Sequence, residues 1–203
     1  AVADKPWWEH LLDLLLGALT KTKLGGADDG KTVTASVPLG SGYDREAEIM
    51  GNVDKLKSAC DLAILNPDFI SRDITGDGQA ETFCNRASRS ICEAMGCSDF
   101  LPSDNANTML QKMAFTPGWK EDTIERAHAH AMKGGLAFIG VEEALHGHLT
   151  AVYPEPMQPS GSWGGPVPLV AHVGRPPNQV RKLSGAYTLA TRPRLRAFLW
   201  GEA

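Results

Sequence analysis

The sequence predicts an α+β fold in which N-terminal helices pack on a C-terminal antiparallel β-sheet. Helical periodicity dominates the chain up to about residue 135, and short apolar runs typical of strands follow it. The 203 residues are 42% hydrophobic and 22% charged, which is close to the globular average and excludes a disordered or fibrous chain. This order of elements indicates an α+β domain.

The first sixty residues contain weaker patterns than the rest of the chain. Residues 7–19 are apolar but contain Glu9, His10 and Asp13, which predicts an amphipathic helix packed on the domain. Residues 32–37 predict a short strand, and residues 45–57 a polar helix. Residues 61–81 are rich in turn signals. We therefore expect residues 1–60 to form an extension packed on a core domain of residues 61–203.

Three helices are expected in the first half of that domain. The first begins near Cys84, since its apolar stripe has helical spacing, with Thr82 as N-cap and Gly96 just past its end. The stripe consists of Cys84, Ala87, Ser88, Ile91, Cys92 and Met95. The other two helices are expected over 106–113, capped by Asp104 or Asn105, and over 120–133.

Five short strands are expected after these helices. They cover residues 136–141, 148–153, 168–174, 186–190 and 195–200. The net charge of −4 argues against a dedicated nucleic-acid-binding protein, and no apolar run is long enough to span a membrane.

Cys84 is the strongest candidate for chemistry because it lies at the first turn of a helix. The free N–H groups and the partial positive charge of a helix N-terminus favour a thiolate, and the same N–H groups can stabilise an oxyanion. Cys84 also belongs to an apolar stripe, so a buried core cysteine is the competing interpretation. A suitably placed base would favour the nucleophile.

Histidines near the predicted strands supply that base. His148 opens a strand and can deprotonate Cys84, then protonate a leaving amine. His172 is in the next strand, where antiparallel pairing would place it beside His148 and let it orient the imidazole. Alternatively, His146, His148 and His172 could bind zinc as in a zinc hydrolase.

Three short motifs in this order resemble the NlpC and CHAP families of cysteine amidases and endopeptidases. They are the cysteine helix from Thr82 to Met95, the segment Asn105-Ala106-Asn107, and the strand Gly147-His148-Leu149-Thr150-Ala151-Val152. Within that group the chain most resembles type VI secretion amidase effectors and phage-like cell-wall hydrolases. The resemblance covers residues 80–175.

The resemblance implies a papain-like fold and a peptidoglycan amidase or endopeptidase that cleaves the stem peptide. It assigns Cys84 as nucleophile and His148 as base. The third position in such folds is variable and polar, and we infer His172 for it. It implies action outside the cytoplasm, in the periplasm or cell wall after secretion or delivery, and no cofactor for catalysis. It also permits an inhibitor protein that binds the groove. Asn85 and Arg86 depart from the Ser-Gly that follows the cysteine in many members.

Further residues are candidates for binding. We expect Asn85, Asn107 and Trp163 to contact substrate, the last from a Gly- and Pro-rich connection beside the site. If the chain is not an enzyme, the same groove is expected to bind wall peptides or a partner.

The segment before Cys84 resembles the front of an EF-hand calcium loop. Oxygen ligands stand at positions 1, 3, 5, 7 and 9, with Gly78 at position 6, but position 12 is Cys84 instead of glutamate. The candidate ligands are Asp73, Thr75, Asp77, Gln79 and Glu81. The loop therefore predicts either a structural calcium ion or a polar turn.

Overall fold

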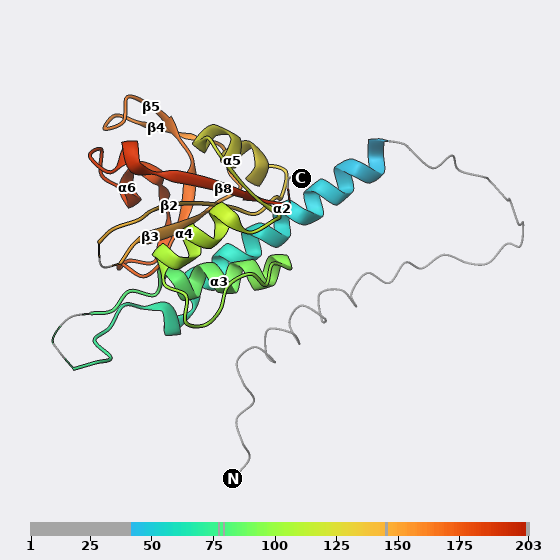
Figure 1. Cartoon of the computed structure of the whole chain (residues 1–203). Helices are drawn as coiled ribbons and strands as arrows, with labels where there is room; N and C mark the ends of the chain where they lie inside the picture. Colours follow the sequence, from blue (N-terminus) through green and yellow to red (C-terminus); the bar gives the residue numbers. More distant parts are fainter. Residues whose placement is uncertain (1–41, 77, 79, 145, 202–203) are drawn as a thin grey trace, which may run out of the picture. The chain divides into compact units, whose positions relative to one another are not determined.

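The structure is a computed structural model that describes residues 42–76, 78, 80–144 and 146–201, with side chains from residue 48 onward. The described residues belong to one compact unit, Gly40–Ala203. Figure 1 shows helices in its N-terminal part and a sheet formed mainly by its C-terminal part. The predicted α+β class is confirmed. The helix expected at 7–19 and the strand expected at 32–37 lie outside the described residues.

Four helices of eight or more residues precede most of the sheet. They are α2 (Gly42–Leu65), α3 (Cys84–Met95), α4 (Ala106–Phe115) and α5 (Ile124–Ala131). The short elements are α6 (Leu183–Ala186), η1 (Pro67–Phe69) and η2 (Arg192–Arg194). Gly96 ends α3 in the left-handed conformation, and the Asn105 side chain caps α4 by accepting from the N–H of Thr108. Both predicted signals are confirmed.

The main sheet has six antiparallel strands in the order β1-β8-β2-β3-β6-β7. Their bounds are β1 (Trp119–Asp122), β2 (Ala137–Val141), β3 (His148–Val152), β6 (Leu169–His172), β7 (Gln179–Lys182) and β8 (Arg196–Trp200). A separate hairpin consists of β4 (Gln158–Ser160) and β5 (Gly165–Val167). Strands β2 and β3 are interior and wholly buried. The run of β2 is apolar throughout, whereas β3 also buries the polar side chains of His148 and Thr150.

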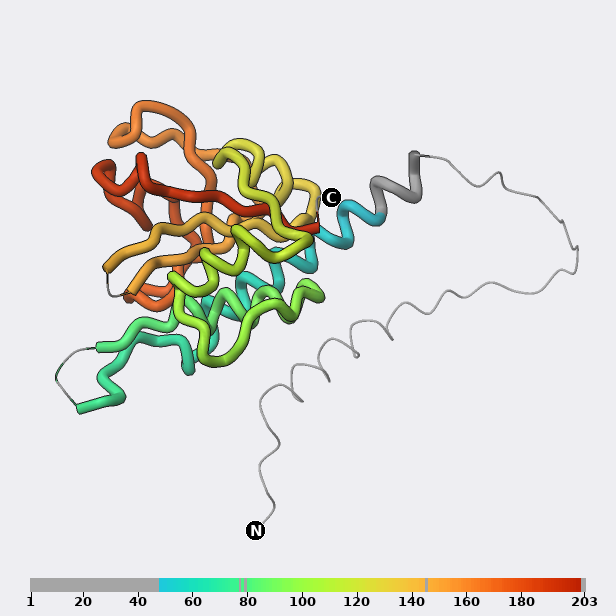
Figure 2. The backbone as a smooth tube through the Cα atoms, in the orientation of Figure 1, coloured from blue at the N-terminus to red at the C-terminus, as the bar shows by residue number. Residues whose placement is uncertain are grey.

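The helices cover the sheet so that α3 lies against β3. Helix α2 packs on α3, α4 contacts β1 to β3, and α5 contacts β2 and β8. Figure 2 traces α2, α3 and α4 in blue to green along one side of the yellow to red strands. One continuous core includes Leu56 and Cys60 of α2, Ile91 of α3 and Phe138 of β2. This packing fixes the start of α3 beside the start of β3.

Two sequence-based assignments are wrong for reasons of tertiary pairing. Residues 186–190 are not a strand, since α6 ends at Ala186 and the Tyr187 side chain turns inward to hydrogen-bond the carbonyl of Ile139. The helix expected from residue 120 begins only at Ile124, because residues 119–122 pair with β8 as strand β1. Thr123 caps the shortened helix by accepting from the N–H of Arg126. The more polar β7 was not expected.

Helix α2 is longer than the sequence predicts. It continues through Leu65, so residues 61–65 are helical where turns are expected. The helix crosses the expected domain boundary at residues 60–61, and Leu56, Ala59, Cys60 and Ala63 are buried in the core. Residues 42–60 therefore belong to the same compact unit as the sheet. No helix among the described residues is long and apolar enough to cross a bilayer.

Candidate active site

Cys84 is the first residue of α3. Phe83 occupies the N-cap position without a side-chain hydrogen bond, so the expected cap by Thr82 is not formed. The thiol of Cys84 instead receives hydrogen bonds from the backbone N–H groups of Asn85 and Leu149. The second donor, Leu149, immediately follows His148, so the cysteine lies beside the start of β3. The side chain is 4% exposed.

His148 and His172 meet across the neighbouring strands β3 and β6. The register of these strands makes the two residues diagonal neighbours. The Nε2 atom of His148 lies 3.3 Å from the Nδ1 atom of His172, and the ring centroids are 5.1 Å apart with an interplanar angle of 72°. Tyr187 supports His148 from another side, with its ring centroid 5.2 Å away. The imidazole of His148 is thereby held by a partner at one nitrogen.

The hydrogen bond between the two rings couples their tautomers, because one nitrogen must donate and the other accept. His172 also makes a hydrogen bond to the backbone of Arg175, which acts to raise its pKa, as a carbonyl acceptor does for a ring N–H. When that bond is made by Nε2–H of His172, its Nδ1 is left as the acceptor for the Nε2–H of His148. Nδ1 of His148 is then unprotonated and able to act as a base.

A cavity of about 480 Å³ contains the thiol and this imidazole. It is lined by Thr75, Ala80, Glu81, Thr82, Cys84, Asn85, Asn105, Ala106, His146, Gly147, His148 and Arg175. All four cysteines of the chain are free and buried, and Cys84 is the one that lines this cavity. The two residues expected to be nucleophile and base therefore share one cavity.

Burial makes the resting pair neutral. It raises the pKa of the Cys84 thiol, and this effect outweighs the opposing hydrogen bonds from the backbone N–H groups of Leu149 and Asn85. Burial also lowers the pKa of His148 to about 3, with smaller contributions from the charges of His172 and Arg175. The expectation that the helix N-terminus gives Cys84 a low pKa is wrong, since desolvation is the larger effect.

Arg175 is a site residue that the sequence analysis missed. It lies in the turn after β6, lines the cavity, and its charge acts on Cys84, His148 and His172. The preceding Gly174 has φ +98°, and a Cβ there would lie 2.8 Å from the backbone nitrogen of Cys84. The Gly-Arg-Pro-Pro turn directly after the strand of His172 was the available signal.

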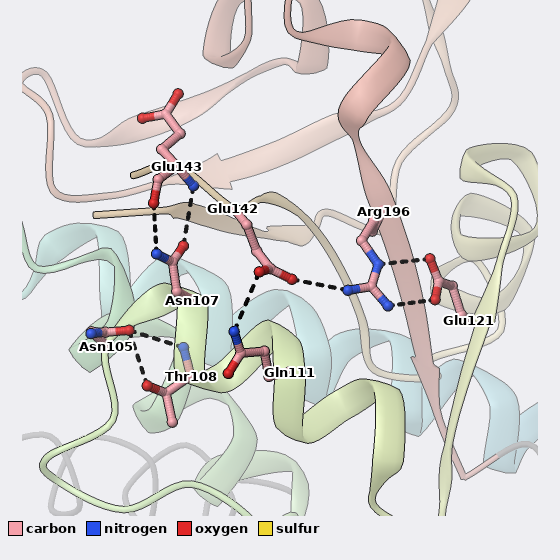
Figure 3. Close-up of polar contacts among 8 residues, drawn as sticks. All are labelled: Asn105, Asn107, Thr108, Gln111, Glu121, Glu142, Glu143 and Arg196. Carbon is pink, nitrogen blue, oxygen red and sulfur yellow. Dashed lines mark hydrogen bonds and ion pairs between the residues drawn. The ribbon is translucent and has the colours of Figure 1, made fainter. Parts of the chain in front are cut away.

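Asn107 holds the loop between β2 and β3. Its Nδ2 donates to the Glu143 carbonyl at 2.7 Å, and its Oδ1 accepts from the Glu143 N–H at 3.3 Å (Figure 3). A Cβ at Gly147 would lie 2.2 Å from this Oδ1 and 2.7 Å from the Val141 carbonyl oxygen. The segments with Asn107 and Gly147, which the sequence analysis treated as separate motifs, therefore form one structural unit directly before His148.

The three candidates for substrate contact differ in position. Asn85 lines the cavity, although its Nδ2 donates to the Asp104 carbonyl at 2.8 Å. Asn107 does not line the cavity, and its amide serves the loop. Trp163 is 7% exposed, packs with its ring 5.3 Å from the Arg192 guanidinium, and lies outside the cavity lining. The structure brings only Asn85 to the site.

The described part of the calcium-like loop uses its acids within the loop. The Asp73 carboxylate accepts from the N–H groups of Gly76 and Gly78 at 2.6 and 2.8 Å, and Glu81 accepts from that of Ile74 at 2.7 Å. This hydrogen bond is the main cause of the lowered pKa of Glu81. Asp77 and Gln79 lie outside the described residues, so the calcium ion stays a prediction.

The zinc hypothesis requires three clustered histidines. Across residues 48–76, 78, 80–144 and 146–201, no group of three or more His, Cys, Asp or Glu side chains is placed to hold a metal ion. His146 is exposed, whereas His148 and His172 are buried against each other. Among the described residues, the three histidines are therefore not clustered as the zinc hypothesis requires.

The chain was compared with family models and with curated proteins. No family model matches it, and no curated protein is significantly similar to it. The inferences below therefore depend on the geometry of the site and on the short motifs of the sequence.

We predict that Gly147→Ala destabilises the protein by about 1–3 kcal/mol, since the new methyl group overlaps Asn107 and Val141. Chemical denaturation measures the free energy of unfolding. Gly161→Ala is the matched control, because a Cβ there meets nothing within 4 Å. In an Asn107→Ala background the cost of Gly147→Ala should be smaller. Equal costs in both backgrounds would show that the two residues are not coupled.

Acid should destabilise the fold through His148. Its pKa is near 6.5 in the unfolded chain and about 3 in the folded protein. Between these values the unfolded state binds the additional proton, so His148 should lower the free energy of unfolding as pH decreases, by at most about 1.4 kcal/mol per pH unit. His172, whose pKa is lowered to about 4, adds to this slope. Denaturation from pH 7 to 4 measures this slope, which His148→Gln should reduce.

Proposed function

We propose that the chain is a papain-like cysteine hydrolase of the NlpC/CHAP type that cleaves an amide bond of the peptidoglycan stem peptide. The observation that carries this proposal is one cavity that holds a helix-opening Cys84 and the imidazole of His148. The Nε2 atom of that imidazole is hydrogen-bonded to His172. These are the parts of a thiol nucleophile, its base and an orienting group.

The chemistry is an acyl transfer through a thioester. Cys84 Sγ attacks the carbonyl carbon as Nδ1 of His148 removes the thiol proton, and backbone N–H groups at the start of α3 stabilise the oxyanion. His148 then protonates the leaving amine as the C–N bond breaks. A water molecule, deprotonated by His148, hydrolyses the thioester, releasing the carboxylic acid and restoring the thiol. His172 keeps Nδ1 of His148 free of a proton at the start of each cycle.

The neutral resting state affects how the nucleophile is activated. Since burial disfavours both the thiolate and the imidazolium, proton transfer should accompany attack on the substrate. The base is unprotonated above pH of about 3, so activity should persist well below pH 6 in a stable protein. Entry of a substrate that excludes water would strengthen the interaction between the separated charges.

The substrate class follows from the resemblance of the short motifs to cell-wall hydrolases. It implies a stem peptide as substrate and action outside the cytoplasm, in the periplasm or cell wall. It is also compatible with an inhibitor protein that fills the groove. Catalysis by the thiol and the imidazole requires no cofactor, and calcium would serve only the Asp73–Glu81 loop.

A non-catalytic binding module is the second candidate. The low exposure and raised pKa of Cys84 favour it, because an inert buried cysteine has both properties. In that case the cavity would bind wall peptides without changing them. Replacing the Cys84 sulfur by oxygen distinguishes the enzyme from the binding module, because only the enzyme would lose its function.

We predict that Cys84→Ser abolishes the release of stem-peptide fragments from purified sacculi. The change in volume is small, so the fold should persist, whereas loss of a thiol nucleophile should reduce the rate by several orders of magnitude. Mass spectrometry of muropeptides gives the activity and the bond that is cleaved. Cys92→Ser is the matched control, since Cys92 is buried in the same helix outside the cavity. Activity retained by Cys84→Ser would contradict the thiol mechanism.

Inhibitors give an independent check of the same mechanism. Iodoacetamide should inactivate the enzyme in proportion to alkylation of Cys84, measured by peptide mapping. A zinc-selective chelator should have no effect. Loss of activity on chelation, with recovery on adding zinc, would instead support metal catalysis by His146, His148 or His172.

His172 should act as a positioning residue. His172→Ala removes the acceptor for the Nε2–H of His148 and should lower kcat by roughly a hundredfold or more with little change in KM. His172→Asn offers an oxygen acceptor to the same N–H and should recover part of kcat. Steady-state kinetics on one soluble muropeptide measures both parameters. If the two variants are equally impaired, His172 has only a packing role.

A further inference from the structure

Arg175 provides the permanently cationic side chain in the lining of the cavity, and this side chain has no partner among the described residues. Its side chain is exposed, and it forms no ion pair or side-chain hydrogen bond with any residue that the structure describes. The cavity lining contains no lysine or second arginine. An arginine left unpaired at a cavity mouth is available for an anionic group of a ligand.

The backbone around Arg175 is held in place although its side chain is free. The Gly174 N–H donates to Oδ1 of Asn178 at 3.0 Å, and Nδ2 of Asn178 donates to the Phe69 carbonyl at 3.3 Å. A Cβ at Gly174 would lie 2.8 Å from the backbone nitrogen of Cys84 and 2.9 Å from that of Phe83, so only glycine fits against the start of α3. The guanidinium group is therefore presented from a braced turn next to the start of the helix that carries Cys84.

The acidic residue of the lining does not neutralise this charge. The Glu81 carboxylate is bound to the N–H of Ile74 on the loop side. No ion pair joins Glu81 to Arg175 among the described residues. The charge of Arg175 instead acts on Cys84, His148 and His172, so its positive charge reaches the residues proposed to react.

We propose that Arg175 is a specificity residue that binds a free carboxylate on the substrate, beside the amide bond that Cys84 attacks. This inference rests on the proposed function for the identity of the reacting bond. A guanidinium group matches a carboxylate in a bidentate geometry, which an amidated substrate does not offer. The substrate class is thus a stem peptide with a free, unamidated carboxylate near the scissile bond.

A series of synthetic stem peptides tests the proposal. Each member has one carboxylate converted to a primary carboxamide, and kcat/KM is measured against the unmodified peptide. For the wild-type enzyme, one of these conversions should lower kcat/KM by about tenfold or more. Arg175→Met should cleave the unmodified peptide more slowly by a similar factor and be insensitive to that conversion. Arg175→Lys should keep part of the preference, and Arg194→Met, at an exposed arginine outside the cavity, should keep all of it.

The other outcomes overturn the proposal and remain distinguishable from failure of the proposed function. If the wild-type enzyme cleaves all members equally, or Arg175→Met still discriminates, Arg175 does not read a carboxylate. If Arg175→Met slows every peptide by the same factor, the residue acts on the reacting groups and not on specificity. If no peptide is cleaved, calorimetry with Cys84→Ser measures the binding of each peptide. Weaker binding of one carboxamide peptide, a difference that Arg175→Met should remove, supports carboxylate recognition without catalysis. Equal binding of all the peptides overturns both the proposed function and carboxylate recognition by Arg175.

Discussion

The close approach of α4 to the β2–β3 loop is the constraint on which the candidate site depends. Asn107 uses both ends of its amide on the backbone of Glu143, and Gly147 fits against the same amide only because it has no Cβ. The next residue is His148, so any displacement of this loop would move the base. Arg196 adds ion pairs to Glu121 and Glu142 on the same side (Figure 3), which joins β8 to the start of the loop.

Burial of the reacting groups determines the electrostatics of the site. A helix N-terminus favours a thiolate, yet Cys84 is so completely enclosed that desolvation outweighs the hydrogen bonds from its neighbouring N–H groups. The imidazole of His148 is neutral for the same reason. Stability and the proposed chemistry thus oppose each other: burial favours both groups in their neutral forms, and the proposed reaction passes through a thiolate and an imidazolium.

The sequence predicts the parts of this structure whose signals are local. Gly96 and Asn105 define helix ends by backbone conformation and side-chain capping, and β2, β3, β6 and β8 follow from apolar runs. The wrong assignments are those that depend on tertiary contacts. Residues 119–122 pair with β8, and Tyr187 turns inward to donate a hydrogen bond to the Ile139 carbonyl. Cys84 and His148 could be selected because their chemistry is rare. Arg175 could not be selected from the sequence, because an exposed arginine in a turn is common and only the structure shows that this one lines the cavity.

The turn at Gly174 and Arg175 joins orientation of the base to the entrance of the cavity. The backbone of Arg175 accepts the hydrogen bond of His172, and its side chain faces the cavity. Asn178 braces the turn through backbone atoms of Gly174 and Phe69, so the path of the main chain does not depend on the guanidinium group. Replacing that side chain therefore leaves in place the backbone of Arg175 that hydrogen-bonds His172. The proposed recognition of a charged substrate and the proposed orientation of the base thus share one turn but depend on different atoms, the guanidinium group and the backbone of Arg175.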